Sequence, residues 1–139
     1  MADALLSVEG LEVGYGEVQV LWGLSLKAQR GQLTAIVGAN GAGKTTTLRA
    51  VAGTLTPWRG RVMFGDEDVT RMPSHVKAAR GLALVPEGRQ LFSAMSVAEN
   101  LELGAFSNRA SRSYSERLDE VLRLFLPRLP GRPTRRSAA

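Results

Sequence analysis

Residues 38–45, GANGAGKT, match the pattern G-x-x-x-x-G-K-[ST], which is typical of a loop that binds phosphate. Its glycines let backbone N–H groups approach phosphate oxygens that a Cβ atom would keep at a distance. The ammonium group of Lys44 suits the β- and γ-phosphates of a nucleotide, and the Thr45 hydroxyl can ligate Mg²⁺. Thr46 supplies a further hydrogen-bond donor. The motif therefore predicts nucleotide chemistry, with a chance glycine-rich turn as the alternative.

The segments on either side of this motif fit a phosphate loop. Residues 31–38 contain a short, nearly continuous apolar run, which predicts a strand buried on both faces. Residues 44–52 favour a helix, and Gly53 with Pro57 predicts its end. The free N–H groups and the positive dipole end of such a helix point toward a bound anion. This strand–loop–helix context favours phosphate binding over a chance turn.

Other elements follow from the apolar pattern. Residues 5–13 and 18–28 alternate in part, with Gly-Tyr-Gly between them, and predict a hairpin. Capping boxes at 96–99 (SVAE) and 113–116 (SYSE) predict the starts of two helices. Between these regions we expect a short strand with a turn, a surface helix and a second buried strand, at residues 60–69, 73–81 and 82–88. Alternating strands and helices predict an α/β domain with an antiparallel N-terminal piece.

Composition narrows the class of protein. The 139 residues fit one domain and contain no cysteine and one histidine, which excludes a disulfide framework, a thiolate metal site and a His-rich cluster. No signal peptide and no apolar run of the ~20 residues that span a bilayer is recognisable, so we expect a soluble intracellular chain. His75, beside Lys77 and Arg80 on the predicted surface helix, is interpreted as solvated.

The net charge of +5 comes from the last part of the chain. Residues 1–108 hold 10 basic and 10 acidic side chains, whereas residues 109–139 hold 8 arginines and 3 acids. Basic tails can bind nucleic acid, but no aromatic side chains interleave the final arginines as a stacking platform requires. We therefore expect no nucleic-acid partner, a partial nucleotide-binding domain at residues 1–126, and a disordered Arg- and Pro-rich tail at 127–139.

Three stretches, at residues 11–53, 60–70 and 81–101, resemble the nucleotide-binding subunit of ABC transporters in the order of that family. The letters VPEGR, LF and VAENL within the last stretch are similar to the ATP-binding subunits of branched-chain amino-acid importers. The resemblance implies a P-loop NTPase core with an antiparallel β N-terminal subdomain. It also implies ATP and Mg²⁺ as cofactors, and a role in energising solute import.

The resemblance assigns roles to individual residues. Tyr15 matches the aromatic residue that stacks on adenine, with a tyrosine packed on its own hairpin as the alternative. Glu87 stands where most ABC ATPases carry a glutamine that touches Mg²⁺ and the attacking water; a solvated loop acid is equally compatible. The Walker A positions are Gly38, Ala39, Asn40, Gly41, Ala42, Gly43, Lys44, Thr45 and Thr46.

A segment after Glu87 matches the part of the family that faces the membrane permease. Leu91, Phe92 and Met95 are large apolar residues for a loop, and they either dock on the permease or pack under the next helix. The resemblance implies permease subunits and a second ATP-binding subunit as partners. It implies a cytoplasmic location, peripheral on the inner face of the cell membrane.

Several parts of the family pattern have no counterpart after residue 108. These are the LSGGQ-type signature, an apolar strand ending in Asp-Glu (Walker B), and the switch histidine; the acids there, Glu116, Asp119 and Glu120, fall on an amphipathic helix. We therefore expect the N-terminal portion of the ATPase domain, with its C-terminal half missing, and ATP binding without efficient hydrolysis.

Two alternatives remain open from the residues. One is a non-enzymatic fragment that binds nucleotide or permease without turnover. The other is a different P-loop NTPase, although a GTPase needs an Asn-Lys-x-Asp motif that the sequence does not contain, and the tail arginines have no evident scaffold to form the lid of a kinase.

Overall fold

The computed structural model describes residues 4–88, 90–105 and 114–125. By its internal contacts the chain divides into two compact units, Met1–Arg89 and Gln90–Ala139. The phosphate-loop motif lies in the first unit, and the apolar segment at residues 91–95 lies in the second.

An antiparallel sheet forms the first unit. Its strands are β1 (Ala4–Tyr15), β2 (Val18–Gln29), β3 (Arg59–Phe64) and β4 (Glu67–Asp68), in the spatial order β2-β1-β3-β4. β1 and β2 form the predicted hairpin, in which Tyr15 pairs with Val18 across a turn that contains Gly16 at φ 57°. The predicted short strand after residue 60 is β3, and it pairs with β1 as well as with β4.

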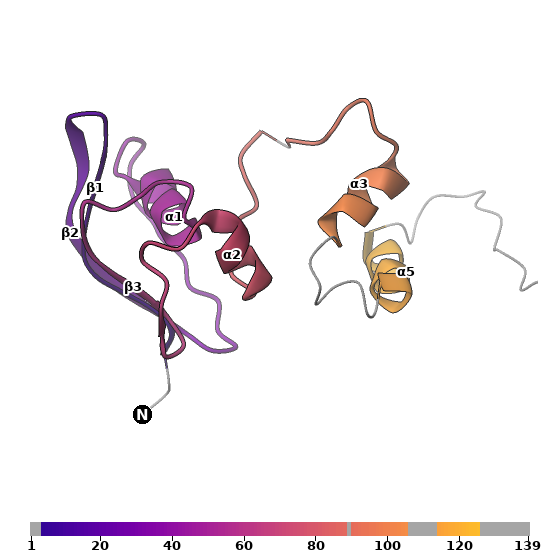
Figure 1. Ribbon diagram of the computed structural model, residues 1–139, viewed down its shortest axis with the longest axis horizontal. Coiled ribbons are helices and arrows are strands. Elements are labelled where there is room, and N and C mark those ends of the chain that lie inside the picture. Colours follow the sequence, from indigo (N-terminus) through magenta and orange to yellow (C-terminus); the bar gives the residue numbers. More distant parts are fainter. Residues whose placement is uncertain (1–3, 89, 106–113, 126–139) are drawn as a thin grey trace, which may run out of the picture. The chain divides into compact units, whose positions relative to one another are not determined.

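Helix α1 (Lys44–Ala52) lies against this sheet and contacts β1 and β2 (Figure 1). Gly53 ends the helix in the left-handed conformation, as predicted, and its N–H donates to the carbonyls of Ala50 and Arg49. The core joins the helix to the sheet through the buried residues Val8, Leu11, Val13, Leu21, Ala50, Val51, Val62 and Val69. Removing these apolar side chains from water fixes the start of α1 relative to the hairpin.

The prediction of two buried strands at residues 31–38 and 82–88 is wrong for this structure. Among the described residues neither segment is a strand, and Leu33, Val37 and Val85 are 99%, 87% and 93% exposed. A parallel strand is stabilised by neighbours on both sides, and no described strand pairs with either segment. The apolar pattern is typical of buried residues, but no part of the chain that the structure describes covers these side chains.

Helix α2 (Ser74–Ala79) begins after Pro73 and ends before Gly81, as predicted. His75 is exposed, also as predicted, but the description of α2 as a surface helix is wrong on one face. Lys77 is fully buried, and its Nζ donates to the carbonyl oxygens of Val51 at 2.8 Å and Ala50 at 3.4 Å. The ammonium group therefore caps the carbonyl end of α1, where the helix dipole favours a positive charge.

The second unit contains α3 (Val97–Gly104) and α5 (Tyr114–Phe125). The capping box of α3 is confirmed: the Ser96 hydroxyl accepts from the Glu99 N–H, and the Glu99 carboxylate accepts from the Ser96 N–H at 2.7 Å. The capping box expected at Ser113 and the tail at 127–139 lie outside the described residues. Among the described helices, none has the length and apolar run that a bilayer crossing needs.

Candidate functional site

The phosphate-loop motif leads directly into α1. Gly43 caps the helix with φ 88°, and Gly41 also has a positive φ of 84°, which side-chain-bearing residues rarely adopt. A Cβ atom on Gly43 would lie 2.6 Å from a Leu21 methyl group of β2. Glycine at position 43 is therefore favoured by the turn, and a side chain there would also displace Leu21.

Lys44 lies at the first position of α1, and its side chain folds back over the loop. Its Nζ donates to the carbonyl oxygens of Ala39 at 2.7 Å and Gly38 at 2.9 Å. These bonds place the ammonium charge beside the loop amides and the N-terminus of α1, where an anion is favoured. Lys44 thus has the position that a phosphate-binding lysine needs.

Thr45 and Glu87, 42 positions apart, meet at the same end of α1. The Thr45 hydroxyl donates to Glu87 Oε1 at 3.3 Å. A hydroxyl and a carboxylate are oxygen ligands of the kind Mg²⁺ prefers, and Mg²⁺ sites typically use one or two protein ligands plus phosphates and waters. Glu87 is exposed and lies beside the phosphate loop.

Tyr15 lies beside the second turn of α1, with 42% of its surface exposed. Its hydroxyl oxygen is 3.4 Å from Thr46 Oγ1 and accepts from Arg49 Nη1 at 3.3 Å. These hydrogen bonds, that of Thr46 first and that of Arg49 second, lower the pKa of the Tyr15 hydroxyl below its ordinary value. The ring predicted to stack on adenine is thus attached to the helix that carries the phosphate loop.

In the second unit, the segment predicted to dock on a permease exposes large apolar side chains. Leu91 and Phe92 are 69% and 57% exposed, and Met95 is half-buried. The Asn100 side chain fixes the backbone beneath them: it accepts from the Phe92 N–H at 3.0 Å and donates to the carbonyls of Phe92, Met95 and Ser96. Phe92 is therefore held outward by an ordered turn.

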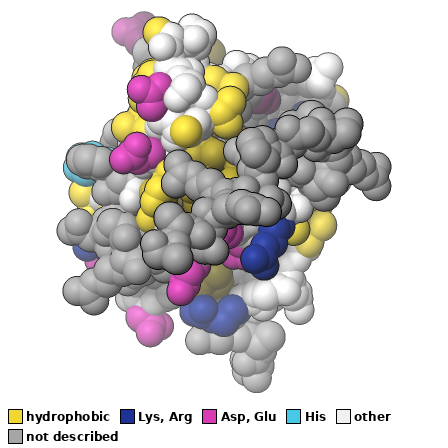
Figure 2. Space-filling model, turned by 90° about the vertical axis from the view of Figure 1, so that its right-hand side faces the viewer, with side chains coloured by type: hydrophobic (Ala, Val, Ile, Leu, Met, Phe, Trp, Pro, Cys, Tyr) yellow, Lys and Arg dark blue, Asp and Glu magenta, His cyan; other side chains and the backbone are white. Residues whose placement is uncertain are grey.

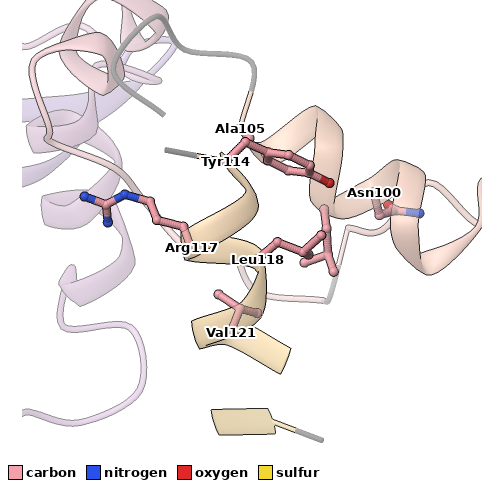
Figure 3. A pocket seen from close by; sticks show the side chains of 8 residues that line it. Asn100, Ala105, Tyr114, Arg117, Leu118 and Val121 are labelled. Carbon is pink, nitrogen blue, oxygen red and sulfur yellow. The ribbon is translucent and has the colours of Figure 1, made fainter. Parts of the chain in front are cut away.

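A separate cavity of about 290 Å³ lies in the second unit. Figure 3 shows Tyr114 and Leu118 of α5 extending toward α3. In the space-filling view of Figure 2, hydrophobic side chains are open to solvent on one face of the molecule. The cavity is lined by Asn100, Leu101, Gly104, Ala105, Tyr114, Arg117, Leu118 and Val121. None of the residues predicted to bind nucleotide lines it, so it is not the nucleotide site.

Sequence reasoning did not single out Arg49, Lys77 or Asn100. The spacing of Thr46 and Arg49, three residues apart on a helix, places them on one face and was a usable signal. Their contact with Tyr15 depends on how the hairpin meets α1, which residue spacing does not report. Lys77 and Asn100 form hydrogen bonds with backbone groups, and such contacts leave no mark in a sequence pattern.

The chain is similar to known proteins in sequence and in structure. Residues 21–134 match the ABC transporter family model. The chain is 35% identical over 133 residues to the high-affinity branched-chain amino acid transport ATP-binding protein BraG of Pseudomonas aeruginosa, covering 96% of this chain and 56% of BraG. It is 38% identical over 117 residues to the putative 2-aminoethylphosphonate import ATP-binding protein PhnT of Salmonella typhimurium, covering 84% of this chain and 31% of PhnT.

A solved structure of an ATP-binding subunit of an ABC transporter is also similar. The two share 30% identity with a TM-score of 0.72, over 87% of this chain and 50% of the solved chain. The chain thus spans about half the length of such relatives, or less. The similarity agrees with the predicted fold class. From the family match and these likenesses, the chain belongs to the ABC transporter ATP-binding family.

Proposed function

We propose that the chain binds ATP with Mg²⁺ as the ATP-binding subunit of an ABC importer. The observation that carries the proposal is the convergence of four groups at the start of α1: the loop glycines, Lys44, the Thr45–Glu87 pair and Tyr15. Each serves one part of the ligand: phosphates for the loop and Lys44, the metal for Thr45 and Glu87, and the base for Tyr15.

The Thr45–Glu87 pair fits a Mg²⁺ ion that is shared with the phosphates. Glu87 would contribute a carboxylate oxygen and Thr45 its hydroxyl oxygen, in agreement with the oxygen chemistry of this ion. When bound, Mg²⁺ neutralises the charge that builds up on phosphate oxygens. The residues of this chain hold and orient the triphosphate around that charge.

We propose binding without efficient hydrolysis for residues 1–139. Phosphoryl transfer depends on positioned charges and a base that orients water, and no Asp-Glu pair follows an apolar strand after residue 108. The test is steady phosphate release by the purified chain with ATP and Mg²⁺. Release above background that disappears in Lys44→Ala would contradict this part of the proposal and would make the chain an active ATPase.

For the transported solute we propose branched-chain amino acids. BraG supports that choice by its name and by its similarity over 96% of this chain. PhnT, whose name refers to a phosphonate, is similar over a shorter part. The test is growth of a strain that lacks its importer ATPase and carries a hybrid subunit containing residues 4–125. Growth that the hybrid restores on leucine but not on aminoethylphosphonate would support the choice. The reverse pattern would overturn it.

Base preference separates an ABC subunit from a GTPase. A stacking ring accepts any flat base, so we expect ATP and GTP to compete with a fluorescent ATP analogue within about tenfold of each other. A GTPase would show guanine preference of several orders of magnitude. Strong discrimination in favour of GTP would therefore overturn the assignment to Tyr15.

Replacing Glu87 with alanine tests the metal assignment. Because the carboxylate would be one of the few protein ligands, we expect the affinity for ATP to fall roughly threefold to tenfold in Mg²⁺ and to stay unchanged when Mg²⁺ is chelated. Glu17→Ala, which removes an exposed acid from the β1–β2 turn, is the matched control. Equal losses with and without Mg²⁺ would assign Glu87 a role other than metal binding.

Replacing Phe92 with alanine tests the proposed permease contact. An exposed aromatic side chain on an ordered turn is a typical interface anchor, so we expect co-purification with the permease subunits to fall at least about tenfold while ATP binding is kept. Phe125→Ala removes another exposed aromatic side chain, from α5, and serves as control. Unchanged co-purification would show that Phe92 is not the anchor.

A further inference from the structure

Both hydrogen-bonding contacts of Tyr15 with Thr46 and Arg49 of α1 are made at the hydroxyl end of the ring. Thr46 Oγ1 lies 3.4 Å and Arg49 Nη1 lies 3.3 Å from that oxygen. Tyr15 comes from the end of β1, and the two partners come from a helix about thirty residues later. The hydroxyl group therefore bridges the hairpin and the phosphate-loop helix.

The hairpin itself holds the Tyr15 ring only in part. Tyr15 is the last residue of β1, and 42% of its surface is exposed. A ring with so little covering keeps freedom of rotation about its side-chain bonds unless its polar end is held. The orientation of the ring consequently depends on the hydroxyl contacts.

The two partners on α1 are suited to that task in different ways. Thr46 is buried, with 6% of its surface exposed, so its hydroxyl group is a fixed point. Arg49 is one helical turn farther on, on the same face and exposed, and its guanidinium reaches the phenol oxygen from outside. The lowered pKa of the Tyr15 hydroxyl agrees with donation from both groups to its oxygen.

We propose that Arg49 is a positioning residue for nucleotide binding: with Thr46 it holds the Tyr15 ring in a fixed orientation beside the phosphate loop. This inference rests on the proposed function, in which that ring stacks on the base. The consequence is that base stacking and triphosphate binding are mechanically joined, because Lys44, Thr45, Thr46 and Arg49 all belong to the first two turns of one helix.

The experiment compares ATP with inorganic tripolyphosphate, which lacks the base, in Arg49→Met and Arg49→Lys. Met keeps the length of the side chain without the donor, and Lys keeps a charge and a donor. We expect Arg49→Met to weaken ATP binding roughly threefold to tenfold and to leave tripolyphosphate binding unchanged. Arg49→Lys recovers part of the loss. In a Tyr15→Phe background, Arg49→Met has no further effect.

A second measurement needs no nucleotide. Ultraviolet titration of the phenol groups, with Tyr15→Phe subtracted to remove the signal of Tyr114, gives the pKa of Tyr15. We expect that pKa to rise toward its ordinary value in Arg49→Met, because the variant loses one of the two donors.

The outcomes separate this inference from the proposed function. Equal losses for ATP and tripolyphosphate would show that Arg49 acts as a charge on the phosphates, which overturns the positioning role. An unchanged Tyr15 pKa in Arg49→Met would overturn it as well, whatever the nucleotide data show. If the pKa moves but the unsubstituted chain binds neither ATP nor tripolyphosphate, the proposed function fails, and the role of Arg49 in binding fails with it.

Discussion

Replacing Lys44 with alanine should abolish nucleotide binding by this chain. The ammonium group is held beside the loop amides by the carbonyls of Gly38 and Ala39. Charge-assisted hydrogen bonds contribute about 1.5–3 kcal/mol each. With two phosphates in reach of the charge, the affinity for ATP should fall by a factor on the order of 100 or more.

The measurement is titration with a fluorescent ATP analogue, followed by competition with ATP. Lys27→Ala is the matched control, since it removes the same charge from an exposed position on β2. It should keep its affinity for ATP within about twofold, because exposed charges are screened by solvent and salt. Equal affinity in Lys44→Ala and the unsubstituted chain would mean that the loop does not bind phosphate, and the proposed function would fail at its first step.

Replacing Lys77 with methionine should lower the free energy of unfolding by about 1–3 kcal/mol, because a buried carbonyl loses its donor. The Val51 carbonyl has its hydrogen bond from Lys77 Nζ at 2.8 Å, whereas the Ala50 carbonyl also accepts from the Gly53 N–H at 3.2 Å. The loss is therefore expected at Val51. Methionine keeps the apolar stem of the side chain and avoids a large cavity.

The effect of Lys77 on stability should depend on pH in a defined direction. Burial lowers the pKa of its amine, and the opposing influence of Asp68 is smaller. Between this lowered pKa and the ordinary value of about 10.4, the unfolded chain binds more protons than the folded chain, so stability rises with pH. Below the lowered pKa the amine is charged in the folded and in the unfolded chain, and burying this charge lowers the free energy of unfolding by its full amount.

Urea unfolding at neutral and at several alkaline pH values checks both statements about Lys77. The difference in unfolding free energy between the unsubstituted chain and Lys77→Met should be positive at neutral pH and should grow on the alkaline side. Exposed Lys27→Met, run in parallel, should show no such growth. A difference that stays flat or shrinks as the pH rises would mean that the amine is not buried in the folded chain.

The hairpin, α1 and the capping box at Ser96 show what local pattern can predict. Gly53 ends α1 and Ser96 begins α3 because each end needs particular backbone or side-chain groups within a few residues. Such requirements are local and can be read from the chain. The phosphate-loop motif is recognisable for the same reason, since its spacing is set within the eight consecutive residues 38–45.

Residues 31–38 show where local pattern fails. Their apolar run predicts a buried strand, but a strand forms only when another strand pairs with it, and the described residues contain no such partner. For Lys77 the prediction fails in the opposite direction. A lysine is expected to be exposed, and its burial is explained only by the carbonyl end of α1, to which it donates. The meeting of Tyr15 with Arg49 and of Thr45 with Glu87 was likewise beyond the reach of spacing.

The exposed run from Leu33 to Val37 leads directly into the phosphate loop, so the loop is anchored differently at its two ends. On the helix side, Thr47 Oγ1 donates to the Gly43 carbonyl at 2.9 Å, and the core holds α1. On the other side, among the described residues, no sheet ladder holds residues 33–37.

Ordering a backbone residue costs about 1–2 kcal/mol in conformational entropy, and a bound triphosphate would have to supply that cost on the unanchored side. Linkage makes the relation reciprocal. A polypeptide strand that ordered residues 33–37 in the arrangement that binds nucleotide would tighten nucleotide binding, and bound nucleotide would tighten that pairing by the same factor.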